Sequence, residues 1–599
     1  MTAKRKRGDE KPPKPPKPPK AARASAQLGP DRKILVAVDF GTTFSGLAWA
    51  QSRKPEVQTP ITQWPDASSG GLEGISSDKV PSEMKYDGQN FKWGFQIPDS
   101  VQRHQTFKLD LDPSQNRTTA LASQYHDPKK APPAYDEDAE RITTDYMGAL
   151  RKHAEQILRY KLPDSALKST PVEYIITVPA VWSDTAQAKT RTCAQAAGMG
   201  VGANLHIISE PEAAALYALD AMDPHNLTVG DTFVLCDAGG GTVDLITYTV
   251  SALRPILKLT EASPGTGSLC GASFLNRKFA EMLRVKLEDQ PGWDEEVLED
   301  AVKYFESVIK RQFRGTFGEE FLVPVPGVLD NAELGIRRNK MTIPGTDIRA
   351  AFEPVLDEVL KLVTGQVKAS KSPVKAIVLV GGFGQNAYLR DSIRQEVKDL
   401  KIEVMQSPNS WTAVVRGALM KGLASTSPNF AKVSIAARAA RKHYGLDVNT
   451  SFNAGEHDYN RRFWDACDGF YRISEMDWFV KKGDLIEENK PFRLRYHRVR
   501  LHSEGPFKIV RDNIWVCQDR DNLGAPQYNE EGNDVQHLVT IHADLSRVPE
   551  HLMPTKRGAD GEKYYRIKYE IQITYHSAYT TYELIYNDVN YGAVNAEYV

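Results

Sequence analysis

Several features that mark other classes of protein are absent from this sequence. Its five cysteines in 599 residues form no Cys-x-x-Cys pair, so neither a disulfide framework nor a zinc site is expected. No apolar run approaches the roughly 20 residues of a membrane-spanning helix, and the N-terminus has no apolar stretch typical of a secretory signal. The pattern Gly-x-x-x-x-Gly-Lys-Ser/Thr does not occur, which disfavours a P-loop fold. We therefore expect a cytoplasmic protein, with the nucleus as an alternative, and no membrane partner.

Net charge is also low, but it is unevenly distributed. The formal net charge is -1, whereas residues 1–33 hold eleven Lys/Arg and three Asp/Glu, a net +8. The Lys-Pro-Pro repeats of this segment favour extended polyproline conformations and predict a disordered tail. Lys4-Arg5-Lys6-Arg7 fits either a nuclear import signal or a solvated charged segment. No specific nucleic-acid partner is expected.

Residues 34–424 have the pattern of an α/β domain, in which strands alternate with helices. Helices are predicted over residues 139–160 and Ser183–Ala197, the second with Ser183 or Asp184 as its N-cap. Short apolar runs predict buried strands at Ile34–Val38, Tyr174–Val178, Phe233–Leu235 and Ala376–Val380.

Beyond residue 424 the pattern becomes that of a β-rich domain. Residues 565–575 alternate apolar and polar side chains, as a half-buried strand does, and Thr580–Tyr586 is expected to pair back across a short turn. The tyrosines here, at period two, are expected mainly on the inward face of a sheet, with a binding surface for a partner as the alternative. We predict a separate β-rich domain over residues 425–599, with an unknown partner.

Two strand–turn–strand segments place an aspartate beside a turn rich in glycine and threonine. In residues 36–50 a buried strand ends in Asp39, and Gly41-Thr42-Thr43 form the turn, for which a simple hairpin is the alternative. In residues 233–250, Asp237 precedes Gly239-Gly240-Gly241-Thr242, and so many glycines suit a close approach of backbone to a ligand. The repetition indicates an internal duplication. Facing each other, the two turns would hold a triphosphate, with both aspartates flanking one Mg²⁺.

A third glycine-rich segment, residues 376–386, follows another apolar strand, and Gly381 and Gly382 would let the chain pass close to a nucleoside. In this order, the three segments resemble the heat shock protein 70 family of the actin-like ATPase superfamily. Residues 175–182 and 208–215 strengthen the match. The resemblance implies two duplicated ribonuclease-H-like lobes that bind ATP or ADP with Mg²⁺.

The resemblance also implies a role for each matching position. Asp39 and Asp237 would organise water molecules around Mg²⁺, whereas Glu210 and Asp244 would orient or polarise the attacking water. Lys108 stands where the family keeps a lysine near the γ-phosphate, with a surface lysine as the alternative. Phosphate contacts fall on Gly41, Thr42, Thr43, Phe44, Gly239, Gly240, Gly241, Thr242 and Gly271. Nucleoside contacts fall on Lys310, Arg311, Gly381, Gly382, Phe383 and Gln385.

The chain departs from the family pattern at the adenine side and after residue 424. Gln385 replaces an arginine that the family often stacks on adenine, and Glu306, before Lys310-Arg311, is shifted by one position. No acidic-hydrophobic linker or helix-rich final segment follows the ATPase region. Residues 440–445 and 478–484 instead resemble the divergent branch typified by heat shock 70 kDa protein 12A.

The leading prediction is an ATP-binding protein that hydrolyses ATP slowly and whose nucleotide state controls the C-terminal module. Chaperone activity on unfolded client proteins is implied by the family alone. Three alternatives remain open: a nucleotide-regulated binding or scaffold protein with little hydrolysis, a small-molecule kinase of the same fold, and a protein that polymerises as actin does.

Overall fold

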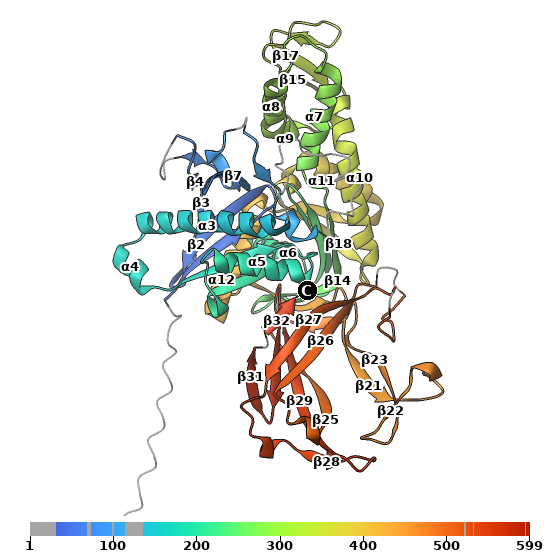
Figure 1. Cartoon of the computed structure of the whole chain (residues 1–599). Helices are drawn as coiled ribbons and strands as arrows, with labels where there is room; N and C mark the ends of the chain where they lie inside the picture. Colours follow the sequence, from blue (N-terminus) through green and yellow to red (C-terminus); the bar gives the residue numbers. More distant parts are fainter. Residues whose placement is uncertain are drawn as a thin grey trace, which may run out of the picture.

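The computed structural model describes residues 32–68, 74–98, 101–113, 136–223, 225–519, 523–530, 532–593 and 595–598. Of the basic tail predicted for residues 1–33, only Arg32 and Lys33 lie in this part of the chain. The described residues form two α/β lobes followed by a β-rich C-terminal region (Figure 1). The predicted fold class is therefore confirmed.

Lobe I is built around one mixed sheet with helices on both faces. Its strands are β1 (Ile34–Asp39), β2 (Phe44–Gln51), β3 (Lys54–Ile61), β6 (Val80–Pro81), β10 (Val172–Val178) and β11 (Leu205–Ser209). Their order is β11-β10-β1-β2-β3, with β6 paired to β2. Short strands above the sheet are β4 (Gln63–Trp64), β5 (Ile75–Ser76), β7 (Glu83–Asp87), β8 (Asn90–Trp93) and β9 (His104–Gln105). The helices are α3 (Asp136–Lys161), α4 (Asp164–Ser169), α5 (Asp184–Ala196), α6 (Glu210–Ala221) and α12 (Ala413–Thr426).

Lobe II repeats the central motif of lobe I. Its strands are β12 (Thr232–Ala238), β13 (Val243–Ala252), β14 (Leu257–Ser268), β18 (Val374–Val380) and β19 (Glu403–Gln406). β12 lies between an antiparallel partner, β13, and a parallel partner, β18, just as β1 lies between β2 and β10. This shared arrangement supports the internal duplication that the two hairpins indicate.

An outer part of lobe II carries further helices and a small sheet (top of Figure 1). Its elements are α7 (Ser273–Leu287), α8 (Glu295–Tyr304), α9 (Lys310–Gln312), β15 (Glu320–Pro324), β16 (Ile336–Arg337) and β17 (Lys340–Pro344). Helices α10 (Gly345–Ala369) and α11 (Ala387–Glu396) pack against the central sheet of lobe II. A π-helical turn, Phe305–Ile309, separates α8 from α9. Such a turn accommodates one extra residue. It therefore gives a physical reason why Glu306 is shifted by one position relative to the family pattern.

The period-two pattern of the central strands distributes their side chains between separate cores. Ile34, Val36 and Val38 of β1 pack with α3 and α5, whereas Leu35 and Ala37 face α6 and α12. Phe233 and Leu235 of β12 join this second core from the other lobe. Helices α6 and α12 are therefore shared by the two sheets.

The contact between α6 and α12 depends on the absence of a side chain at Gly417. A Cβ atom there would lie 1.6 Å from the backbone oxygen of Ala213. We expect Gly417→Ala to lower the free energy of unfolding by about 3 kcal/mol, because the two backbones must separate. Chemical denaturation of both proteins measures this difference.

Gly148 in α3 provides the matched control, because a Cβ atom there meets nothing within 4 Å. Gly148→Ala is expected to stabilise the protein by up to about 1 kcal/mol through helix propensity. Equal stabilities for the two variants would show that α6 and α12 tolerate a wider separation.

The C-terminal region consists of two antiparallel sheets. The first sheet contains β21 (His443–Ser451), β22 (Phe463–Asp465), β23 (Phe470–Val480), β26 (Ile509–Cys517), β27 (Val535–Asp544) and β32 (Asn595–Tyr598). The second contains β25 (Phe492–Leu501), β28 (Thr555–Arg557), β29 (Lys563–Tyr575), β30 (Thr580–Tyr586) and β31 (Val589–Ala593). β29 and β30 form the hairpin predicted for this segment. Buried tyrosines from it line the core between the sheets: Tyr565, Tyr569, Tyr582 and Tyr586.

The sheet of lobe II continues past the predicted domain boundary at residue 424. Strand β20 (Val433–Ala439) runs parallel to β14, and β24 (Leu485–Glu487) pairs with β20. The full order is β19-β18-β12-β13-β14-β20-β24. The C-terminal region thus supplies two strands to the ATPase-like lobe, whereas the boundary itself stays a prediction.

Candidate nucleotide-binding site

A cleft of about 1260 Å³ contains most of the residues predicted to bind nucleotide. It is lined from lobe I by the turn after β1 and from lobe II by the turn after β12 and the segment after β18. The predicted phosphate contacts in the lining are Gly41, Thr42, Thr43, Phe44, Gly239, Gly240, Gly241 and Thr242. The predicted nucleoside contacts in it are Lys310, Arg311, Gly381, Gly382, Phe383 and Gln385.

The two hairpin turns touch directly, and glycine makes this possible. A Cβ atom at Gly240 would lie 2.0 Å from Thr43 Oγ1, and one at Gly241 would lie 2.5 Å from Thr42 Cγ2. Gly271 is not among the residues that line the cleft. It packs behind the turn instead, where its N–H donates to the Gly241 carbonyl at 3.1 Å. The contact between the turns brings glycine backbone of one turn next to the hydroxyls of Thr42 and Thr43 in the other, and such a group of donors suits an anion.

Three predicted catalytic carboxylates, Asp39, Glu210 and Asp237, converge on the cleft. All three are buried. Asp39 is the last residue of β1, Asp237 is the second-last residue of β12, and Glu210 is the first residue of α6. Burial raises the pKa of Asp237 well above its usual value, and the charge of Glu210 adds to this effect. A bound cation would offset both the burial of the Asp237 carboxylate and its repulsion by Glu210.

Lys108 forms an ion pair with Glu210, although it does not line the cleft itself. Lys108 is only 2% exposed, which excludes the alternative of a surface lysine. Burial raises the pKa of Glu210, while the neighbouring Lys108 opposes that shift. The pair therefore holds the Glu210 carboxylate in one orientation at the edge of the cleft.

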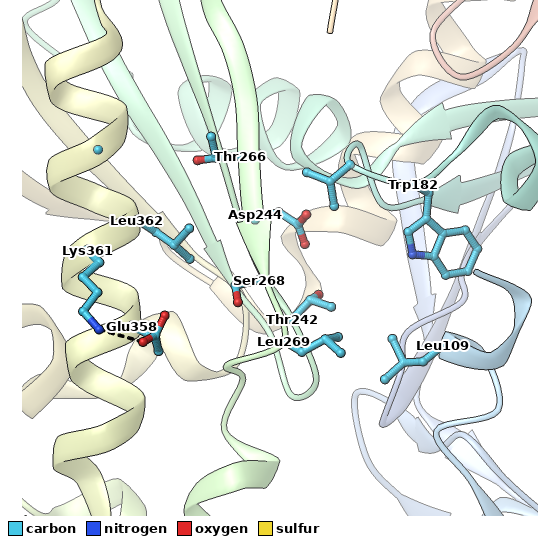
Figure 2. Close-up of a pocket in the computed structure, with 13 residues that line it drawn as sticks. Leu109, Trp182, Thr242, Asp244, Thr266, Ser268, Leu269, Glu358, Lys361 and Leu362 are labelled. Atoms are coloured by element: carbon cyan, nitrogen blue, oxygen red, sulfur yellow. Dashed lines mark hydrogen bonds and ion pairs between the residues drawn. The ribbon is translucent and has the colours of Figure 1, made fainter. Parts of the chain in front are cut away.

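Asp244 is the one predicted catalytic carboxylate that is not among the residues lining the cleft. It lines a second cavity of about 340 Å³, and Figure 2 shows its carboxylate between Leu362 of α10 and Trp182 of lobe I. Thr242 lines both cavities and separates them. Burial raises the pKa of Asp244 to about 7, and its Oδ1 atom has no hydrogen-bond partner among the described residues. The charge of Glu210 also raises this pKa and Lys108 opposes it, so Asp244 lies within electrostatic reach of the predicted catalytic pair.

Lys79 and Trp411 are among the cleft residues that belong to no sequence motif and were not predicted. Lys79 lies next to β6, and its Nζ is 2.6 Å from Asp39 Oδ2. Trp411 stands edge-on to Phe44, with ring centroids 5.8 Å apart, and closes the nucleoside side near Gly382. An isolated lysine and an isolated tryptophan give no local pattern by which sequence reasoning could find them.

The donor set fits a magnesium ion held mostly by water and phosphate. Among the described residues, no group of three or more His, Cys, Asp or Glu side chains could hold a metal ion by itself. Asp39 and Asp237 face the same cleft from opposite lobes, in line with the few protein carboxylates that Mg²⁺ usually takes.

Two duplicated lobes with a carboxylate-bearing hairpin in each define a nucleotide-binding protein of the actin-like ATPase class. The chain belongs to the Hsp70 family, since the family model described as Hsp70 protein matches residues 94–434. It is accordingly an Hsp70-like nucleotide-binding protein. No helix in the part of the chain that the structure describes is long and apolar enough to cross a membrane.

Several curated relatives are similar to this chain. Heat shock 70 kDa protein 12A of Mus musculus is 23% identical over 561 residues, covering 76% of this chain and 79% of the relative. Heat shock 70 kDa protein 12B of Homo sapiens is 24% identical, covering 82% and 81%. Chaperone protein HscA of Pectobacterium carotovorum is 28% identical over 268 residues, covering 42% and 38%. The long matches to 12A and 12B confirm the divergent branch that the C-terminal motifs indicate.

Proposed function

We propose that this chain binds ATP with Mg²⁺ in the interlobe cleft, hydrolyses it slowly, and uses the nucleotide state to control its C-terminal region. The observation that carries this proposal is the convergence of Asp39, Glu210 and Asp237 on one cleft beside two touching glycine–threonine turns. Phosphoryl transfer to water needs mainly positioning and charge stabilisation, and these residues are suited to supply both.

Each side chain has a distinct task in this proposal. The hydroxyls of Thr42 and Thr43 and the neighbouring amides bind the phosphates, and Thr242 does so from the opposite turn. Glu210, held by Lys108, orients the attacking water and accepts a hydrogen bond from it. When bound, Mg²⁺ neutralises charge on the phosphate oxygens.

Helix α6 offers a route from the cleft to the C-terminal region. Glu212 lies two residues after Glu210 and forms ion pairs with Arg438 of β20 and, at 2.9 Å, with Lys421 of α12. Ser577, in the turn between β29 and β30, donates a hydrogen bond to the same carboxylate. A shift of α6 on nucleotide binding would therefore move the C-terminal hairpin directly. An unfolded client protein is the partner we propose for this region.

Calorimetric titration with ATP and Mg²⁺, followed by single-turnover hydrolysis, tests the proposal. AMP is expected to bind at least about tenfold more weakly than ATP, because the two turns hold the β- and γ-phosphates. Absence of ATP binding would refute the proposal. Binding without hydrolysis would favour the scaffold alternative, and ATP-dependent phosphorylation of sugars or polyols would favour the kinase.

A further inference from the structure

The buried lysine beside Asp39 belongs to the cleft but has no role in the function proposed above. Lys79 precedes β6, which pairs with the start of β2 immediately after the phosphate turn of lobe I. Its stem passes over Gly46, where a Cβ atom would lie 3.4 Å from Lys79 Cγ and 3.5 Å from Lys79 Cε. The residue is 8% exposed, so its four methylene groups are packed rather than mobile.

The Lys79 ammonium group is held at the floor of the cleft by Asp39. Lys79 Nζ lies 2.6 Å from Asp39 Oδ2, while the other oxygen, Oδ1, accepts a hydrogen bond from Thr177 at 3.3 Å. Both Lys79 and Asp39 line the cleft together with Thr42 and Thr43. A positive charge therefore stands beside the turn that would receive the phosphates.

The charges in the cleft favour phosphate as a second partner of the Lys79 ammonium group, besides Asp39. The carboxylates of Asp39, Glu210 and Asp237 face the same cleft, and a triphosphate adds several further negative charges. Lys108 is already paired with Glu210, so it cannot neutralise Asp39 as well. Lysine binds phosphate as a point charge, and a packed stem loses little conformational freedom when it does so.

We propose that Lys79 is a phosphate-binding residue and that it allows this chain to bind ATP in the absence of Mg²⁺. The inference rests on the proposed nucleotide-binding function. Phosphate oxygens share the Lys79 ammonium group with Asp39, so metal-free ATP meets a neutral ion pair instead of a bare carboxylate. Mg²⁺ then strengthens binding but is not required for it.

Equilibrium titration of the full chain with a fluorescent ATP analogue, in excess Mg²⁺ and in EDTA, tests this role. The unmodified protein is expected to bind in EDTA within about tenfold of its affinity in Mg²⁺. Lys79→Met is expected to lose about 10- to 100-fold of affinity in EDTA and less in Mg²⁺. Lys79→Arg keeps the charge and is expected to retain binding in EDTA within about fivefold of the unmodified protein.

Lys375→Met is the matched control, because Lys375 Nζ also lies 2.6 Å from a carboxylate, that of Asp231, outside the cleft. It is expected to bind as the unmodified protein does. If Lys79→Met does not fold, Asp39→Asn/Lys79→Met is compared with Asp39→Asn alone, since this pair leaves no unpaired buried carboxylate. The double variant is expected to bind about 10- to 100-fold more weakly in EDTA.

The outcomes separate this inference from the function on which it rests. No binding by the unmodified protein with Mg²⁺ would refute nucleotide binding altogether. Strong binding with Mg²⁺ but none in EDTA would overturn the role of Lys79 alone. Equal affinities of Lys79→Met and the unmodified protein in EDTA would also overturn it and leave Lys79 as the counterion of Asp39.

Discussion

Replacing Glu210 by glutamine is expected to lower the single-turnover rate of ATP hydrolysis by about 10²- to 10³-fold. The amide keeps the size of the side chain but cannot accept a proton or orient water with a negative charge. Affinity for ATP is expected to change by less than about threefold, because the phosphates are bound mainly by the two turns. A fall in rate without a fall in affinity identifies an interaction made in the transition state.

The ion pair between Glu173 and Lys33 supplies a control for this experiment. Glu173 in β10 is buried, and its Oε1 lies 2.8 Å from Lys33 Nζ. Glu173→Gln makes the same chemical change at a buried, lysine-paired carboxylate outside the cleft, and the hydrolysis rate is expected to remain within about twofold of the unmodified rate. Unchanged hydrolysis in Glu210→Gln would contradict the assignment of Glu210. Asp39→Asn and Asp237→Asn are each expected to lose about tenfold or more, through weaker metal organisation.

The second large effect is expected at Arg438, which joins three buried carboxylates. It pairs with Glu212, with Glu261 at 3.5 Å and with Glu488 at 3.2 Å, and the three acidic side chains are at most 4% exposed. Arg438→Met would leave these charges in the interior with only partial compensation. We expect a loss of about 3–5 kcal/mol in the free energy of unfolding, measured by chemical denaturation.

The same variant should disconnect the cleft from the C-terminal region. Hydrogen exchange of residues 576–586 is expected to respond to ATP in the unmodified protein and not in Arg438→Met. Arg472→Met is the control, because Arg472 pairs with Asp465 at 2.7 Å and with Asp468 within the C-terminal sheet. It is expected to weaken that sheet and to keep the response to ATP. An intact response in Arg438→Met would refute the route through α6.

The stability loss in Arg438→Met is expected to depend on pH because of Glu212. Burial alone would raise the pKa of this carboxyl, but Arg438 and Lys421 hold it down to about 2. A carboxyl whose pKa is lowered on folding stabilises the protein above its unfolded value and loses that contribution as pH falls toward the folded value. The difference in stability between the unmodified protein and Arg438→Met is therefore expected to shrink as pH falls from about 5 toward 3.

The parts of the site that the sequence predicted are those encoded locally. A buried strand, an aspartate and a glycine-rich turn are consecutive in both hairpins, so each can be recognised without knowledge of the partner lobe. Ser183 is likewise the N-cap of α5, where its Oγ accepts a hydrogen bond from the Ala186 N–H. In each case the backbone requirement and the residue that satisfies it lie within a few positions.

Residues that act across large sequence separations were not predictable in this way. Lys79 lies 40 positions from Asp39, and Arg438 lies 226 positions from Glu212. A lysine or arginine on or beside a strand is as compatible with a solvated surface as with a buried pair, and the sequence alone does not distinguish the two. The extension of the lobe II sheet by β20 is a comparable case, because parallel pairing needs no particular residue type.

The sequence by itself determined the α/β class, the two glycine- and threonine-rich turns and the β-rich character of the C-terminal region, because short-range periodicity and backbone demands encode all three. Only the tertiary structure decided that Asp244 lines a second cavity, that Lys79 pairs with Asp39 and that α6 connects the cleft to Ser577. These relations depend on which surfaces meet after the lobes pack. Packing is determined by the sum of many weak contacts spread over the whole chain, so it cannot be predicted from any single segment of the sequence.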